Sequence, residues 1–379
     1  HQNYFSASNP DVLAFHEAFA DAVALFQHFS HTEVVRHQVA RTRGDLKSQN
    51  LLGQLALQFG QAMGEHRGAL RQYIDAPPDP AQYRTTTEPH GRGAILMAAL
   101  FRAFQNIYAQ RSKDLYRIAT GGTGKLPDGD IHPDLVNRLA VEAAKSARHL
   151  LNMCIRALDY VPPVDLTFGE YVRALITADY DLVRNDDRHY RVAMVDAFRS
   201  WGIYPPGVNV LDETALLWRP PAAYELDVLR GVIRDLDFSD WTLSADRRTV
   251  YREMERGRLK MRDWLYAHAR ESLILSHDAN GRRKTSGDDG DAPRDAANAD
   301  ADARDQDAGR PRINGQFGLF ILGKGWQSVP RNQGNRPKFS VDSIRPCSRI
   351  GPDGQQRVDF VAAITQTRAG YFDPKVQKM

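Results

Sequence analysis

The most apolar stretch of the sequence, VLAFHEAFADAVALFQHF, covers residues 12–29. It contains 13 apolar residues in 18, and Asn9-Pro10-Asp11 in front of it is a typical helix start. A helix that is apolar on nearly all sides is usually enclosed by other elements. We therefore expect residues 12–29 to form a buried helix at the centre of the fold.

Four more stretches within the first two hundred residues have helical periodicity. One has Pro133 just inside its start, and another opens with TFGE at residues 167–170, which has the spacing of a capping box. The predicted helices cover 94–108, 133–158, 167–178 and 190–202. The sequence thus predicts a mainly α fold, with a helical bundle over residues 1–202.

The composition changes beyond this bundle. Residues 203–276 contain two Pro pairs and then renewed helical periodicity, so we expect a helical extension there. Residues 277–313 are rich in Asp, Ala, Gly and Arg, which predicts a disordered linker. Residues 314–379 contain the strand-like segments FGLFIL, FSVDSI and RVDFVAAITQT, with GPDG as a turn, and predict a small β-rich C-terminal unit.

Charge and cysteine content exclude several classes of protein. Lys and Arg number 50 against 47 Asp and Glu, so no strong field attracts nucleic acid or an anionic membrane. Cys154 and Cys347 are too few for a disulfide framework or a CxxC metal site. No apolar run reaches the roughly 20 residues that cross a bilayer, and no signal peptide is visible. Compartment and oligomeric state stay open.

Glu17 and Asp21 are the carboxylates most suggestive of chemistry. Their spacing of four residues places both on one face of the apolar helix. A carboxylate in apolar surroundings needs compensation, either from an Arg or His of a neighbouring helix or from a bound metal. The pattern alone leaves both outcomes open.

Two motifs resemble those of thermolysin-like zinc metallopeptidases, the gluzincins. HEAFAD at residues 16–21 resembles their N-E-A-x-S-D segment, with His for Asn and Ala for Ser. EPHGRG at residues 88–93 resembles the E-x-H-x-x-G segment of the related fungalysins. A weaker similarity covers residues 160–179, so that the resemblance extends over about residues 10–182.

The resemblance implies a fold like the helical C-terminal half of these enzymes. It also implies zinc as cofactor, hydrolysis of peptide bonds in a peptide or protein substrate, and a role for three residues. Glu17 would be a zinc ligand, Asp21 would orient a ligating histidine from behind, and His90 would stabilise the oxyanion.

The remaining zinc ligands are missing from the sequence. The family takes two histidines and a general base from H-E-x-x-H, which does not occur in residues 1–379. We expect this motif just upstream of His1, and without it residues 1–379 should fold but lack peptidase activity. The alternative is a non-enzymatic helical scaffold or interaction protein derived from a peptidase.

Two other signals favour ordinary structure. GGTGK at residues 121–125 lacks the first Gly and the final Ser or Thr of a phosphate-binding loop, so we interpret it as a flexible loop. His28, His31 and His37 lie where the sequence becomes polar, which indicates a solvated helix end rather than a metal site.

Overall fold

The computed structural model describes residues 9–46, 77–205, 208, 212–218, 234, 246–267, 329–350 and 356–367. Helices dominate these residues, which confirms the mainly α class. The chain forms two compact units, one built mainly from His1–Trp218 and the other mainly from the rest of the chain. No helix within the described ranges combines the length and the apolar composition that crossing a membrane requires.

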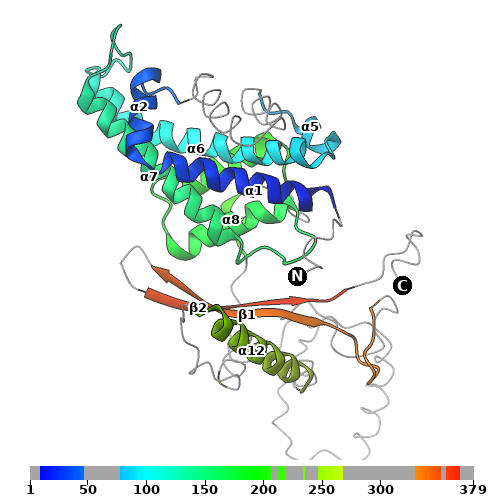
Figure 1. Cartoon of the computed structure of the whole chain (residues 1–379). Helices are drawn as coiled ribbons and strands as arrows, with labels where there is room; N and C mark the ends of the chain where they lie inside the picture. Colours follow the sequence, from blue (N-terminus) through cyan, green and yellow to red (C-terminus); the bar gives the residue numbers. More distant parts are fainter. Residues whose placement is uncertain are drawn as a thin grey trace, which may run out of the picture. The chain divides into compact units, whose positions relative to one another are not determined.

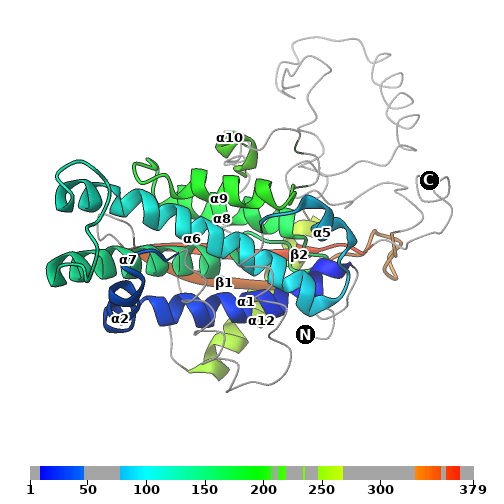
Figure 2. The same cartoon turned by 90° about the horizontal axis from the view of Figure 1, so that it is seen from above.

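The first unit contains eight of the described helices (Figures 1 and 2). Each of the five helices predicted from the sequence is present, although the second begins earlier and ends later than expected. The helices are α1 (Pro10–Phe29), α2 (Thr32–Thr42), α5 (Pro80–Thr85), α6 (Pro89–Ala119), α7 (Pro133–Ala157), α8 (Phe168–Leu182), α9 (Tyr190–Ser200) and α10 (Glu213–Leu216).

The long helix α6 lies at the middle of this unit. Viewed from above, it lies between α1 on one side and α9 on the other, and it contacts both (Figure 2). Aromatic rings join α1 to α6, with the Phe26 and Phe104 centroids 5.9 Å apart and those of Phe29 and Phe104 5.3 Å apart. The two helices run in the same direction, so their N-termini lie at the same end of the unit.

Helix α1 is more exposed than its composition suggested. Phe15, Ala18, Phe26 and other residues on one side are buried, but the opposite side is open. The exposed side carries Leu13, His16, Glu17, Ala20 and Gln27. The expectation of a helix buried all round was therefore wrong, because alanine counts as apolar in a pattern yet is equally compatible with a surface position.

Capping bonds explain where several helices begin. The Asn9 side chain accepts a hydrogen bond from the Asp11 amide at the start of α1. Glu88 does the same for the His90 and Gly91 amides at the start of α6. At α8 both bonds of the predicted capping box are present, between Thr167 and Glu170.

The second unit contains α12 (Arg247–Ala267), β1 (Ser340–Ile350) and β2 (Gln356–Thr365). The strands pair antiparallel, from Ser340 opposite Thr365 to Ile350 opposite Gln356. Helix α12 packs on β1, and the Tyr266 ring lies 4.5 Å from that of Phe339. Two of the predicted strand segments fall in β1 and β2.

Some predictions for this part of the chain stay untested, and one predicted segment includes residues of both units. FGLFIL, the GPDG turn and the 277–313 linker lie outside the described residues. The predicted helical extension over 203–276 spans the boundary, because α10 belongs to the first unit and α12 to the second.

Candidate functional site

The side chains of Glu17 and His90 face each other from two neighbouring helices. Glu17 lies in the second turn of α1, and His90 lies in the first turn of α6. The Glu17 Oε2 atom is 3.5 Å from His90 Nδ1, although the residues are 73 apart in the sequence. The Glu17 side chain is 51% exposed and that of His90 43%, so both can reach a ligand in solvent.

A glycine brings the two helices together at this point. A Cβ atom on Gly93 would lie 2.8 Å from the Ala14 carbonyl oxygen, 3.3 Å from Glu17 Cβ and 3.4 Å from the Ala18 amide nitrogen. The backbones of α1 and α6 therefore touch beside Glu17, which is closer than any side chain at position 93 would permit. The sequence motif pointed to this glycine without indicating what it contacts.

Asp21 lies one turn beyond Glu17 on α1 and is partly buried. Its predicted role is to orient a histidine that binds the metal from upstream of residue 1. The role of Asp21 thus remains a prediction.

The Glu17 and His90 side chains carry atoms of the kind that binds zinc, but they are fewer than a catalytic zinc site needs. A glutamate oxygen and an imidazole nitrogen are both common zinc ligands, and a catalytic site usually has three protein ligands. In the described ranges of the chain, no three His, Cys, Asp or Glu side chains lie close enough together to hold a metal. Glu17 and His90 thus bring to this place two atoms that can bind a metal.

The histidines after Glu17 form no such group either. His28 is partly buried, and burial, followed by the nearby His31, lowers its pKa. His31 is the N-terminal cap residue of α2 and is exposed, as is His37 on that helix. The positions of His31 and His37 agree with the interpretation of a solvated helix end, whereas His28 is partly buried.

The GGTGK stretch is an exposed loop between two helices. Gly121, Gly122 and Gly124 have positive φ angles, and open space surrounds each of them. The loop follows α6, whereas a phosphate-binding loop follows a strand. The stretch thus lacks the preceding strand of a phosphate-binding loop.

A network of buried charges further along the unit was not predicted. Asp179, 3% exposed at its side chain, contacts His149 Nε2 at 2.7 Å and Arg191 Nη1 at 2.8 Å. Arg191 also donates to Glu213 and to the carbonyl oxygens of Val183 and Arg184. These bonds compensate the buried charges within the protein, so the network holds α7, α8, α9 and α10 together.

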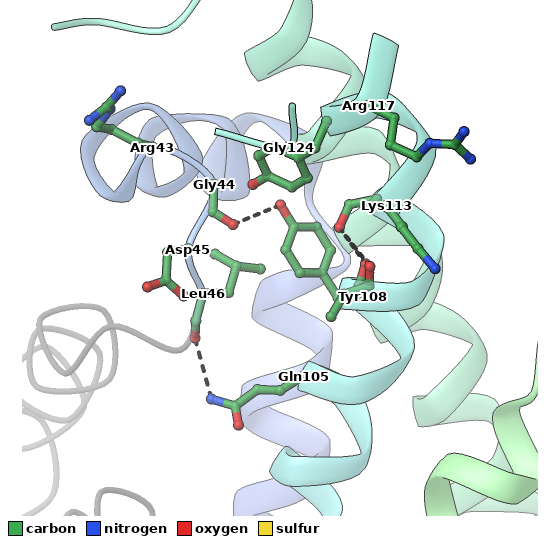
Figure 3. A pocket seen from close by; sticks show the side chains of 12 residues that line it. Arg43, Gly44, Asp45, Leu46, Gln105, Tyr108, Lys113, Arg117 and Gly124 are labelled. Carbon is green, nitrogen blue, oxygen red and sulfur yellow. Dashed lines mark hydrogen bonds between the residues drawn. The ribbon is translucent and has the colours of Figure 1, made fainter. Parts of the chain in front are cut away.

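A pocket of about 530 Å³ lies near the second half of α6 (Figure 3). Tyr108, at its floor, donates a hydrogen bond to the Gly44 carbonyl oxygen, and burial raises the pKa of its phenol. Arg43 and Arg117 at the rim point away from the cavity in Figure 3. Gln105 is 15 residues beyond His90 on the same helix, about 22 Å along its axis, so the pocket is separate from the Glu17–His90 pair.

Comparison with protein-family models, with curated proteins and with solved structures gives no match for this chain. The motifs and the geometry described above therefore carry the functional interpretation by themselves.

Proposed function

We propose that this chain is the helical half of a zinc-dependent endopeptidase, with Glu17 as a zinc ligand and His90 as the oxyanion-stabilising residue. The observation that supports it is the 3.5 Å approach of Glu17 to His90. The two motifs that resemble the gluzincins are far apart in the sequence, and their key side chains meet at one accessible place. Asp21, on the same helix, is proposed to orient a histidine ligand by binding the ring nitrogen that does not contact the metal.

The contact between Glu17 and His90 contributes little to the stability of the fold. A contact between a carboxylate and an imidazole that are both about half exposed contributes at most roughly 1 kcal/mol, because water already solvates both groups. The fold nevertheless places a glycine where the helices must touch for Glu17 and His90 to meet. This favours a functional role for the pair over the simple pairing of a carboxylate with a neighbouring histidine.

Each residue has a defined task in the proposed chemistry. Zinc, when bound, polarises the substrate carbonyl and lowers the pKa of a coordinated water. The Glu17 carboxylate would hold one position of the metal. The His90 ring, which faces Glu17 through Nδ1, would donate a hydrogen bond to the oxyanion that develops on the peptide carbonyl.

A second candidate is a non-enzymatic scaffold or interaction protein that kept this helical architecture. Residues 1–379 contain no H-E-x-x-H, the motif that supplies two zinc ligands and the general base in the peptidases. The two proposals differ in zinc content and in peptidase activity, so one set of variants separates them.

The experiment compares zinc content and casein cleavage in the protein at its natural length. Glu17→Ala should lose most of its zinc, because a site without one of its three protein ligands binds weakly. Glu33→Ala is the control, since Glu33 is an exposed glutamate on α2 that pairs with Arg36. Normal zinc content in Glu17→Ala would refute the ligand assignment.

His90→Ala should keep its zinc yet lower kcat by roughly 10²–10³-fold, since an oxyanion contact strengthens only in the transition state. His37→Ala, which removes an exposed histidine of α2, should leave kcat unchanged. A parent protein with neither zinc nor chelator-sensitive cleavage would support the scaffold alternative.

A further inference from the structure

Four elements of the helical unit meet at the carboxylate of Asp11. This residue is 3% exposed, and it accepts hydrogen bonds from Arg92 Nε of α6, from Tyr83 Oη of α5 at 2.9 Å and from the Phe168 amide of α8 at 2.8 Å. Asp11 itself belongs to the first turn of α1. One buried side chain therefore fixes the start of α1 against three other elements.

The Arg92 side chain also has several partners besides Asp11. Its Nη1 donates to the carbonyl oxygens of Tyr83 at 2.6 Å and Thr86 at 2.7 Å, and its guanidinium lies 4.2 Å from the centre of the Tyr83 ring. Hydrogen bonds from a planar guanidinium have fixed directions, so this arrangement defines one orientation of α6 relative to α1.

This junction lies directly beside the candidate site. Arg92 follows His90 by two residues, and Asp11 precedes Glu17 by six, about 9 Å along the helix axis. Gly93 comes next on α6, at the backbone contact with Ala14 and Ala18. The ion pair thus fixes the relative position of the two helices along their axes, and the glycine fixes their separation.

We propose that Asp11, Arg92 and Gly93 are positioning residues that set the distance between Glu17 and His90. The catalytic consequence rests on the proposed function, whereas the structural claim does not. A buried ion pair is a weak source of net stability, because desolvation cancels much of its attraction. Its fixed geometry suits a positioning role, since a displacement of about 1 Å can cost a catalytic site on the order of 10²-fold in rate.

The test measures the contact and the activity separately. The contact is followed by ¹⁵N NMR of histidine-labelled protein, with the His90 signal assigned through His90→Gln. In the parent protein, Glu17→Gln should shift the His90 ring nitrogen resonances. In Gly93→Ala and in Asp11→Asn, the same Glu17→Gln change should no longer shift them, because the side chains have moved apart.

Activity is compared at equal zinc occupancy. Asp11→Asn and Gly93→Ala should lower kcat by roughly 10–100-fold while KM stays within about twofold, because positioning affects the transition state more than substrate binding. The control is Glu142→Gln, which breaks the similarly buried Arg111–Glu142 pair between α6 and α7. It should lower thermal stability but leave both kcat and the His90 response unchanged.

Two results would overturn the positioning role. One is a His90 response to Glu17→Gln that persists in both variants. The other is a loss of kcat in Glu142→Gln as large as in Asp11→Asn, which would show that general stability explains the effect. A parent protein without peptidase activity would refute the proposed function, and the NMR comparison would then decide the positioning claim by itself.

Discussion

Individual buried charges in this protein have several partners from different elements. Asp179 contacts both His149 and Arg191, and Arg191 is only 1% exposed at its side chain. Removing Asp179 would leave the buried Arg191 with Glu213 as its remaining carboxylate partner, and losing one partner of a buried pair costs more than the intact pair contributes. Asp179 is therefore expected to matter for folding, whereas the half-exposed Glu17 is expected to matter for function.

Asp179→Asn should lower the free energy of unfolding by about 3–5 kcal/mol, the usual cost of breaking a buried ion pair. Urea denaturation followed by circular dichroism measures this difference. Asp196→Asn is the matched control, because Asp196 pairs with Arg199 on the surface of α9 and should cost at most about 1 kcal/mol. Equal losses in the two variants would contradict a special role for the buried network.

At the residue scale, two sequence motifs single out Glu17 and His90, whose side chains lie 3.5 Å apart, but no motif singles out the residues packed around them. In the sequence, Asp11 is marked only as part of a helix start. Arg92 has no predicted role beyond its place in the motif that contains His90 and Gly93. A buried charge leaves no mark in a single sequence, because its compensation depends on which distant residue folds against it.

At the scale of elements, helix starts were easier to predict than helix lengths. The capping box at Thr167 and Pro133 at the start of α7 were both confirmed, since these signals act through local hydrogen bonds and backbone angles. Helix α6 begins at Pro89, before the predicted start at residue 94. Glycine weakens a helix, which is why the sequence predicted this helix to begin only at residue 94, yet Gly93 lies inside α6 and permits the close approach of α1.

Helix α8 offers a direct test of such local signals. Thr167→Ala should lower the free energy of unfolding by about 0.5–2 kcal/mol, because the Glu170 amide loses its side-chain acceptor. Thr167→Ser keeps the hydroxyl and should cost much less. Thermal denaturation of the two variants gives the comparison, and an equal loss in both would attribute the effect to the methyl group instead of the cap.

At the scale of the whole molecule, the helical unit has a core of its own. Its hydrophobic cluster, as far as the structure describes it, runs from Ala14 to Leu216 and draws on α1, α2 and every helix from α6 to α10. Leu217 packs against this cluster, and no described residue beyond it takes part. Because every described member of this cluster lies within residues 1–218, we expect this part of the chain to fold cooperatively without the rest.

Deletion of residues 219–379 should therefore leave the thermal midpoint of the helical unit within a few degrees of its value in the full chain. Scanning calorimetry of both proteins measures this, with far-ultraviolet circular dichroism as a check on helix content. A unit of this size should unfold with an enthalpy of roughly 150 kcal/mol near 60 °C if it behaves as one cooperative domain. A midpoint lowered by well over ten degrees, or a broad transition of much smaller enthalpy, would mean that the second unit completes the fold of the first.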